Sequence, residues 1–391
     1  MPGRIRLVVL FGGRSAEHEI SCISAFNLLR AVDPQRYDVL PIGITRTGQW
    51  VDASDTSLAS AANVGALPSP DLAPAASALE LAGIPPMATD EVTTVVFPLL
   101  HGPMGEDGTV QGLLEVAGTP YIGSGVLGSA VCMDKSVAKE ILRAHDIPQA
   151  RWMSARVTEL SDEFLRELAD SLGFPLFVKP ANLGSSIGIS RANDASELQR
   201  AVELARSYDE YLVFEEAIRG REIEVAILGD IAPKASLPGE IVCDGTFYGF
   251  EEKYRSSSTK LLVPAPLADS EIAEVQGLAI RAFKALRAEG MARVDFFYGG
   301  DGRFLVNEVN TIPGFTPISM YPMLWEASGL SYAGLVDELV ELALQRHQRR
   351  SGKGRSFPCG TAHHTRPRRG SHQNSWQQHE EDGRSNTRSG G

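Results

Sequence analysis

The chain has 391 residues, of which 43% are hydrophobic and 22% charged, with 49 acidic residues against 37 basic ones and a formal charge of −12. This composition is that of a folded globular protein and excludes a disordered, collagen-like or disulfide-stapled chain. The charge is uneven: residues 346–391 hold ten Lys or Arg against three Asp or Glu, a local +7, which leaves −19 on residues 1–345. A body of this length exceeds what one hydrophobic core usually organises, so we expect two or three domains.

In chain order, the first elements resemble half of a nucleotide-type α/β unit. Residues 5–11 (IRLVVLF) are a predicted buried strand, and the glycines at 12–13 permit a tight turn into a helix over about 15–32, with Ser15 as candidate N-cap. Residues 56–89, rich in Ala, Ser and Pro without a steady period, predict a surface excursion. Further strands are predicted over 37–44 and 92–100, the latter running into the polar, glycine-rich residues 101–108.

The remainder of the body mixes both kinds of element. Asp134 is a candidate N-cap for a helix whose apolar positions recur at helical spacing and which stops before Pro148. Other helices are predicted over 110–117, 196–205, 270–288 and 332–345, and strands over 176–179, 211–215, 222–228, 292–298 and 304–309. This mixture predicts an α/β or α+β fold. The predicted units are an N-terminal α/β domain (1–123), a small central α+β domain (124–214), a C-terminal α+β domain (215–346) and a tail (347–391).

The tail differs in composition from everything before it. Arg, Gly, Ser, Gln, Asn and His dominate residues 347–391, which predicts disorder. An RNA-binding arm would also be cationic, but the tail has no repeat and little aromatic interleaving. An unselected extension is the simpler interpretation, and we assign the tail no function.

Charge and cysteine usage limit the partners and the compartment. A body at −19 argues against nucleic acid, and no run approaches the roughly 20 apolar residues that a membrane span needs. The early apolar run is too short for a secretory leader. The four cysteines are far apart without a CxxC pair, which predicts free thiols in a reducing cytoplasm. An anionic substrate would have to be bound by a few local cations.

One candidate for such binding is a lysine beside a glycine- and serine-rich loop. Lys179 ends a predicted strand, and residues 182–188 (NLGSSIG) follow it. A fixed cation next to small residues with accessible backbone N–H groups suits phosphate oxygens. Many such loops are only turns, and the spacing differs from that of a P-loop.

A second candidate lies on two apolar strands near residue 300. Asp295, Glu308 and Asn310 supply three oxygen donors suited to Mg²⁺ that bridges phosphates. Any one of them could be the solvent-facing alternate of a half-exposed strand, but buried strands normally exclude such residues unless they are paired or ligating. Together they predict a metal site.

At this point the chain resembles the ATP-grasp superfamily and, within it, the D-alanine:D-alanine ligase family. The resemblance runs in order from about residue 5 to about 345, and the tail has no counterpart in it. It implies an ATP-grasp fold with a Rossmann-like N-terminal domain. The matching segments are FGGRSAEHEIS (11–21), HGPMGEDG (101–108), MDK (133–135), KP (179–180) with GSS (184–186), EEKY (251–254) and NEVNT (307–311).

The resemblance also implies roles in binding ATP and metal ions. Lys135 and Lys179 would hold ATP phosphates and Lys253 the γ-phosphate. Glu215, Glu216 and Ile218 would meet the adenine through backbone groups, and Glu222 would accept hydrogen bonds from the ribose. Asp295, Glu308 and Asn310 would bind two Mg²⁺, with Mn²⁺ as a substitute.

The implied reaction joins two D-alanine molecules through an acyl phosphate, releasing ADP and phosphate, for peptidoglycan precursor synthesis. Glu17, with His101 nearby, would bind the ammonium of the first D-alanine, although a carboxylate there also complements the helix dipole. The oxyanion would be stabilised by Arg293 and the Gly314 amide, and the second D-alanine carboxylate would be held by Ser319 and the Met320 backbone. Ser185 and Tyr254 would link to Glu17 and close a loop over the site.

Alternatives remain within and outside this family. Another ATP-grasp ligase could take D-lactate or D-serine as second substrate, and the Lys253-Tyr254 pair favours the dipeptide product. A nucleotide-binding module without catalysis would also share the fold, but the full set of candidate lysines and metal ligands speaks against it. A homodimer is implied by the resemblance alone.

Overall fold

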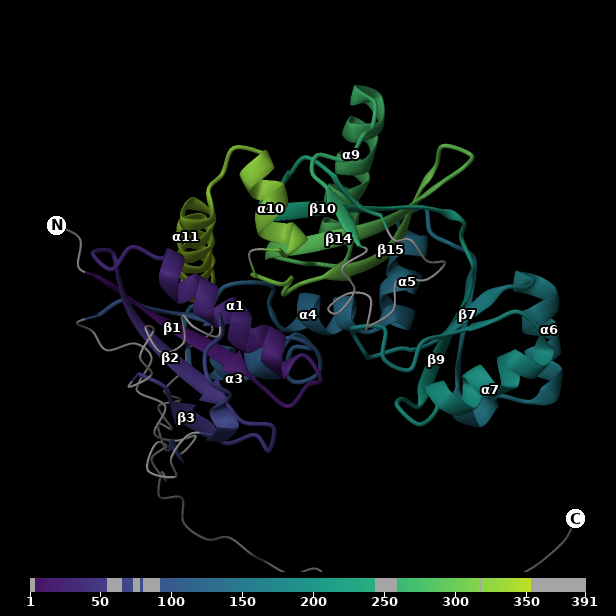
Figure 1. Cartoon of the computed structure of the whole chain (residues 1–391), viewed down its shortest axis with the longest axis horizontal. Coiled ribbons are helices and arrows are strands. Elements are labelled where there is room, and N and C mark those ends of the chain that lie inside the picture. Colours follow the sequence, from purple (N-terminus) through teal and green to yellow (C-terminus); the bar gives the residue numbers. More distant parts are fainter. Residues whose placement is uncertain are drawn as a thin grey trace, which may run out of the picture. The chain divides into compact units, whose positions relative to one another are not determined.

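The computed structural model describes residues 4–54, 65–72, 78–79, 92–242, 259–316 and 318–352. Within these ranges the chain forms three β-sheets with helices packed on them (Figure 1), which confirms the predicted mixed α/β class. Lys253 and Tyr254, most of the 56–89 excursion and residues 353–391 of the tail lie outside the described residues.

The N-terminal sheet has the strand order β4-β3-β2-β1-β5. β1 (Ile5–Gly12) is parallel to both β2 (Tyr37–Ile44) and β5 (Thr94–Pro98), and β3 (Trp50–Asp52) and β4 (Ala78–Leu79) extend the sheet in antiparallel fashion. Alternate residues of β1 pack on α1 (His18–Ala31) on one face and on α3 (Thr109–Val116) on the other. Burial of both faces explains why the strand is a continuous apolar run.

The turn after β1 places Glu17 at the carboxyl end of the sheet. A Cβ on Gly12, whose φ is +87°, would lie 2.4 Å from the Ile44 carbonyl oxygen, so the turn requires glycine. The predicted start of the helix at Ser15 is wrong: α1 begins at His18 with Glu17 in the N-cap position. The Ser15 hydroxyl accepts the Glu17 N–H at 3.2 Å and belongs to the turn itself.

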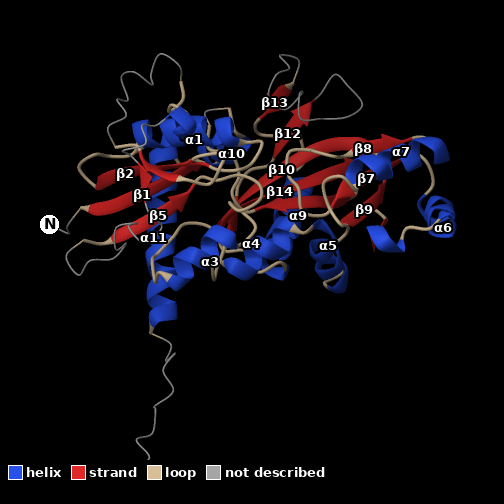
Figure 2. Ribbon diagram, turned by 90° about the horizontal axis from the view of Figure 1, so that it is seen from below, coloured by secondary structure: helices blue, strands red, loops and turns tan. Residues whose placement is uncertain are grey.

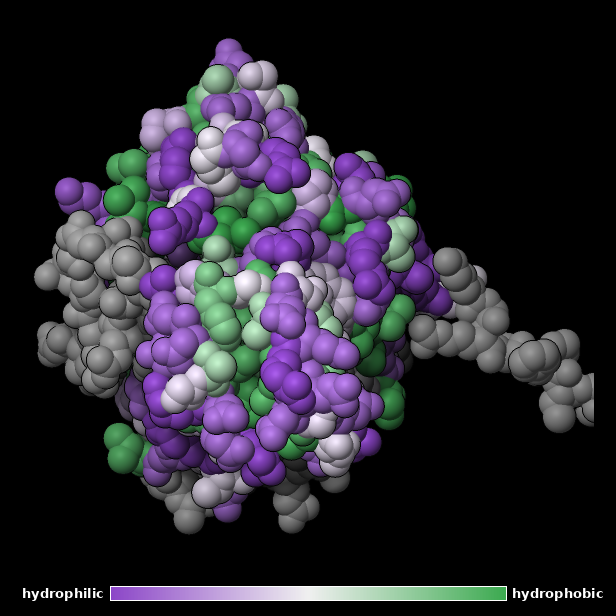
Figure 3. Space-filling model, turned by 90° about the vertical axis from the view of Figure 1, so that its right-hand side faces the viewer, coloured by the Kyte–Doolittle hydropathy of each residue, from purple (hydrophilic) through white to green (hydrophobic). Residues whose placement is uncertain are grey.

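The central sheet is antiparallel, with the order β6-β9-β7-β8. Its strands are β6 (Trp152–Arg156), β7 (Leu176–Pro180), β8 (Ser190–Ala192) and β9 (Tyr211–Glu216). α6 (Asp162–Leu172) and α7 (Ala195–Ala205) cover one face (Figure 1) and share a core with Val178 and Phe214. Because side chains alternate along a strand, Lys179 and Glu215 point to the opposite face. On the side drawn in Figure 3, hydrophilic residues surround smaller hydrophobic patches.

The largest sheet follows the order β13-β12-β10-β14-β15, with β11 also paired to β10. Figure 2 labels β13, β12, β10 and β14 of this sheet. Its strands are β10 (Gly220–Gly229), β11 (Lys234–Ala235), β12 (Gly239–Val242), β13 (Lys260–Leu262), β14 (Gly290–Gly299) and β15 (Phe304–Asn310). One face shares a core with α9 (Asp269–Ala285), α4 (Val126–Met133) and α5 (Lys135–Ala144). Chain order would group α4 and α5 with the central sheet, so their packing here is a result of tertiary structure.

Two C-terminal helices join the N-terminal sheet to the other face of the largest sheet. α10 (Met320–Ala327) and α11 (Tyr332–Ser351) contribute to one hydrophobic core that also contains residues of β1, β5, β10 and β14. α11 continues five residues into the predicted tail, which corrects the start of that tail. None of the described helices has the length and apolar content of a membrane span.

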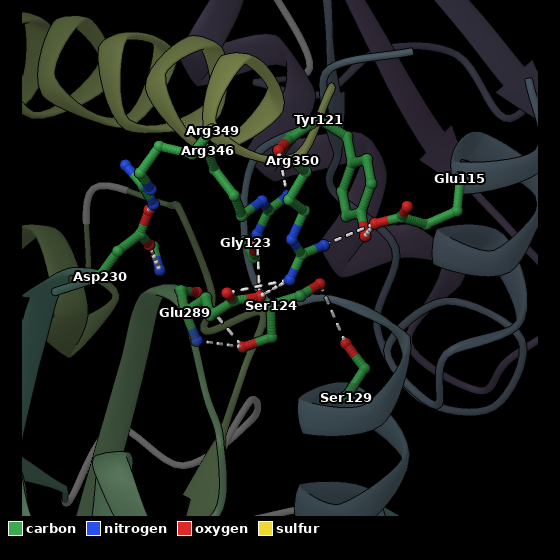
Figure 4. A network of polar contacts seen from close by, with 11 residues as sticks. Glu115, Tyr121, Gly123, Ser124, Ser129, Asp230, Glu289, Arg346, Arg349 and Arg350 are labelled. Atoms are coloured by element: carbon green, nitrogen blue, oxygen red, sulfur yellow. Dashed lines mark hydrogen bonds and ion pairs between the residues drawn. The ribbon is translucent and has the colours of Figure 1, made fainter. Parts of the chain in front are cut away.

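Three arginines at the end of α11 contact segments next to the N-terminal sheet and next to the largest sheet (Figure 4). Arg346 is 4% exposed; it donates to the Tyr121 carbonyl at 2.7 Å and to the Gly123 carbonyl, and its guanidinium lies 4.4 Å from the centre of the Tyr121 ring. Arg350 pairs with Glu115 after the N-terminal sheet and with Glu289 before β14, each at 2.7 Å. Arg349 pairs with Asp230 at 2.6 Å, so all three of these arginines of the basic region belong to the folded body.

Candidate active site

Charged residues are aligned across three neighbouring strands of the largest sheet. The antiparallel register places Asp295 of β14 between Glu224 of β10 and Glu308 of β15, and places Arg293 opposite Asn310. Val294, which lies between Arg293 and Asp295 on β14, is apolar and belongs to the core shared with α9. Alternation along the strand therefore turns the charged residues to the opposite face. The pairing shifts register after Asp295, an irregularity of the kind that often adjoins active sites.

Arg293 is held in place by two carboxylates. Its Nε and Nη2 donate to the two oxygens of Asp295, each at 2.7 Å, and Nε lies 3.1 Å from Glu224 Oε2. Burial alone would lower the pKa of Arg293, but Asp295 and then Glu224 raise it well above its ordinary value. The site therefore contains a permanent positive charge in a fixed position, as stabilisation of a developing oxyanion requires.

The three predicted metal ligands lie together on this face. Asp295 and Glu308 are cross-strand partners, and Asn310 Nδ2 donates to Asp295 Oδ2 at 3.0 Å. The described residues contain no cluster of three Asp, Glu, His or Cys side chains spaced to hold a metal ion without other donors. Two carboxylates and an amide nevertheless fit Mg²⁺, which commonly completes its octahedral shell with phosphate oxygens and water.

The two predicted phosphate lysines both reach β15 from other elements. Lys179 donates from Nζ to Glu215 Oε2 at 2.7 Å and to Asn307 Oδ1 at 3.4 Å. Lys135 is the first residue of α5; its Nζ donates to the Leu183 carbonyl at 2.6 Å and lies 3.9 Å from Glu308 Oε2. Two ammonium groups thus border the acidic positions, an arrangement suited to a phosphate chain with a bound cation.

α5 begins where it does because of its N-cap. As predicted, Asp134 caps the helix, accepting the N–H groups of Ser136 and Val137 at 2.9 and 3.0 Å. The cap fixes the first turn of α5 and so directs Lys135 toward the glycine- and serine-rich loop.

The carboxylates of the predicted adenine segment are occupied by other protein groups. Glu215 binds Lys179, and Glu216 accepts from the backbone N–H and Nε of Arg151 at 2.8 and 2.7 Å. The occupied carboxylates leave the backbone groups for the base edge, and the backbone contact that the resemblance implies remains a prediction. The adenine contact of the half-buried Ile218 and the ribose contact of Glu222 on β10 remain predictions.

The glycine- and serine-rich loop lies against Glu17. A Cβ built on Gly184 would be 3.6 Å from Glu17 Oε2. Ser185 and Ser186 follow with φ of +52° and +57°, a left-handed conformation that side chains rarely adopt and that concentrates at functional sites. The predicted hydrogen bond between Ser185 and Glu17 remains a prediction, but the structure brings their segments together.

His101 contributes a buried ring nitrogen to the same region. Its Nδ1 pairs with the Ile312 carbonyl at 3.0 Å, which fixes the ring between the N-terminal sheet and the turn after β15. Its Nε2 is buried and has no hydrogen-bond partner among the described residues. Burial lowers the pKa of His101, although the charge of Glu17 opposes this. A neutral imidazole with an unpartnered nitrogen is available to a bound substrate.

Gly314 and Ser319 form the far end of the site. A Cβ on Gly314 would lie 2.7 Å from Ser319 Oγ, so a larger residue would displace that hydroxyl. Ser319 occupies the N-cap position of α10, and its hydroxyl accepts the Thr316 N–H at 3.0 Å. Met320 is the first helical residue, and N–H groups in a first turn can bind a carboxylate.

Three residues at the site escaped prediction. Glu224 could have been found from its place two residues after Glu222 on one strand, and Lys139 from its place four residues after Lys135 on one helix face. Glu106 was recognised only as part of a glycine-rich stretch. It accepts the Gly102 N–H at 2.9 Å, and burial, followed by the charge of Glu17, raises its pKa to about 8.

Glu106 predicts a pH dependence of stability. Its pKa rises from an ordinary 4.5 to about 8 in the folded protein, so its contribution to stability is complete below pH 4.5 and is lost as the pH rises through 8. In metal-free, nucleotide-free wild-type protein, Glu106 should make Tm fall as the pH rises from 4.5 to 8. Glu106→Gln should reduce the slope of that fall by roughly 2 °C per pH unit. Differential scanning calorimetry at several pH values measures it, with the exposed Glu167→Gln as control. Parallel curves for Glu106→Gln and wild type would contradict this assignment.

Comparison with known proteins agrees with the site. A family model described as the D-ala D-ala ligase N-terminus matches residues 6–124, and one described as the C-terminus matches residues 141–341. A D-alanine–D-alanine ligase of Halothermothrix orenii is 46% identical over 346 residues, covering 88% of this chain and 99% of that protein. One of Bacillus cytotoxicus is 44% identical over 353 residues, with 88% and 97% covered.

Solved structures show the same likeness. The D-alanine–D-alanine ligase of Coxiella burnetii is 39% identical with a TM-score of 0.75, covering 89% of this chain and 96% of that one. A D-Ala:D-Ser ligase of Enterococcus faecalis is 32% identical with a TM-score of 0.76, with 87% and 100% covered. The chain therefore belongs to the D-alanine–D-alanine ligase family and has its ATP-grasp fold.

Proposed function

We propose that this protein joins two D-alanine molecules into D-alanyl-D-alanine at the expense of ATP, for peptidoglycan precursor synthesis. The observation that carries this proposal is the strand register, which sets Asp295 beside Glu308 and Arg293 beside Asn310, with Lys135 3.9 Å from Glu308. Phosphoryl transfer needs such a set of oxygen donors and cations around a phosphate chain.

The first step is attack by the carboxylate of one D-alanine on the γ-phosphate, giving an acyl phosphate and ADP. Glu17 binds the ammonium of this D-alanine, and the neutral His101 lies beside it. Lys135 and Lys179 bind phosphate oxygens. Asp295, Glu308 and Asn310 would hold Mg²⁺, with Mn²⁺ as a substitute; when bound, the cation neutralises charge on the β- and γ-phosphates.

In the second step the amine of another D-alanine attacks the acyl phosphate carbonyl and phosphate leaves. Arg293 and the Gly314 amide stabilise the oxyanion of the tetrahedral intermediate, and each such donor contributes about 3 to 4 kcal/mol in comparable sites. Ser319 and the Met320 backbone bind the carboxylate of this second D-alanine. Ser185 and Tyr254 close a loop over the site, and Lys253 binds the γ-phosphate. Tyr254 and Lys253 lie outside the described residues.

Phosphate release tests the function. With ATP, Mg²⁺ and D-alanine the purified protein should release phosphate and form the dipeptide, and either D-serine or D-lactate as second substrate should give at least about tenfold lower kcat/KM. The likeness to a D-Ala:D-Ser ligase makes D-serine the most relevant alternative second substrate. Absence of D-alanine-dependent turnover would refute the proposal, whereas a preference for D-serine would redirect it.

We further propose a cytoplasmic homodimer. Cys22 and Cys132 are buried free thiols, which suits a reducing compartment, and dimerisation rests on the family resemblance. Light scattering coupled to size-exclusion chromatography would return the monomer mass if the dimer is wrong. Fractionation of cells that express the chain would test the compartment.

A further inference from the structure

A buried lysine, Lys139, shares a carboxylate with Lys179, the residue proposed to bind ATP phosphates. Lys139 is on α5, one turn after Lys135, and is 2% exposed. Its Nζ lies 3.0 Å from Glu215 Oε1, while Lys179 Nζ donates to Oε2 of the same carboxylate at 2.7 Å. Each oxygen of Glu215 therefore faces a different lysine Nζ. Burial lowers the pKa of Lys139, whereas the charge of Glu215 opposes this, and with both lysines protonated the three residues carry one net positive charge.

Fold stability alone does not account for this cluster. Burial by itself would raise the pKa of Glu215, but Lys139 and Lys179 more than offset this and lower it to about 2, so the carboxylate stays ionised. Buried charges are costly to desolvate, and well-packed apolar residues of similar volume often replace them without loss of stability. A buried group of three charges next to a phosphate site is better explained by its effect on the phosphate.

We propose that Lys139 is a positioning residue that keeps Lys179 available to the phosphates of ATP. By occupying Oε1 of Glu215, Lys139 prevents that carboxylate from binding Lys179 with both oxygens. It also balances the charge of Glu215, so that the charge of Lys179 is left for the ligand. This inference rests on the proposed ATP site but not on the ligase chemistry.

Binding measured without D-alanine tests this role separately from turnover. Isothermal titration calorimetry gives Kd for a non-hydrolysable ATP analogue with Mg²⁺, and competition against that analogue gives Kd for adenosine. Lys139→Met should raise the Kd of the ATP analogue by about tenfold or more and should leave the Kd of adenosine within about twofold of wild type. The reason is that one unit of charge is lost near the phosphates only. The exposed Lys284→Met on α9 is the matched control and should change neither Kd.

A second variant tests the charge balance. Lys139→Met combined with Glu215→Gln restores one net positive charge, so the ratio of analogue affinity to adenosine affinity should recover most of the loss. Lys139→Arg keeps the charge and should bind the analogue within about threefold of wild type. Equal weakening of the analogue and adenosine in Lys139→Met, or no recovery in the double variant, would overturn the proposal. If Lys139→Met fails to fold, Glu215→Gln alone should raise the affinity ratio, and an unchanged ratio would overturn it.

Discussion

Replacing Glu308 by Gln should reduce D-alanine-dependent phosphate release by about a thousandfold or more at saturating ATP and D-alanine. Glu308 faces Asp295 across β14 and β15, and Arg293 and Asn310 already bind the Asp295 carboxylate. The amide keeps the size of the side chain but removes the negative charge that a bridging cation needs. A coupled phosphate assay measures the loss, and circular dichroism shows whether the fold persists.

A matched carboxyl-to-amide change is available on the same hairpin. Asp301 lies in the turn between β14 and β15, where it is exposed and pairs with Arg303. Asp301→Asn should keep wild-type turnover. Excess EDTA should abolish wild-type turnover, and Mg²⁺ or Mn²⁺ should restore it. Full activity in Glu308→Gln would show that this residue is not a metal ligand.

Replacing Arg346 by Met should lower Tm by about 5 to 10 °C, because several kcal/mol of stabilisation are lost. The buried guanidinium donates to the carbonyls of Tyr121 and Gly123, and an unsatisfied buried acceptor costs about 1 to 3 kcal/mol. Those carbonyls belong to the segment that leads from the N-terminal sheet toward α4. Thermal unfolding followed by circular dichroism measures the effect, and turnover near the lowered Tm should fall with it.

Two truncations separate these arginines from the rest of the basic region. A chain that ends after Gly352 keeps α11 and should retain wild-type Tm and turnover. A chain that ends after Gln345 also loses the ion pairs of Arg349 with Asp230 and of Arg350 with Glu289. That chain should be less stable than Arg346→Met. Equal Tm values for the two truncations would rule out the role given to the end of α11.

Local pattern predicted the strands that carry the candidate site and several of the helices. The strands over 176–179, 211–215, 222–228, 292–298 and 304–309 were predicted to within two residues of their observed ends, because buried strands are uniformly apolar or strictly alternating. The helices α4, α6 and α10 were not predicted, nor were the shorter strands β3, β4, β6, β8, β11, β12 and β13. α4 is small and apolar with little helical periodicity, and its neighbours in the core decide its conformation. The start of α1 was misplaced because the Ser15 hydroxyl accepts the Glu17 N–H within the turn, and the helix begins only at His18.

The sequence by itself determined the family, the fold class and which residue types could bind phosphate and metal, because these depend on short motifs and on the period of the apolar residues. Tertiary structure alone decided which other groups the phosphate- and metal-binding residues contact. Glu215 contacts Lys179, which is 36 residues earlier in the chain, and Lys139, which is 76 residues earlier. Arg346 donates to a carbonyl 223 residues away. Such pairings are set by sheet register and core packing between distant segments, which no local pattern contains.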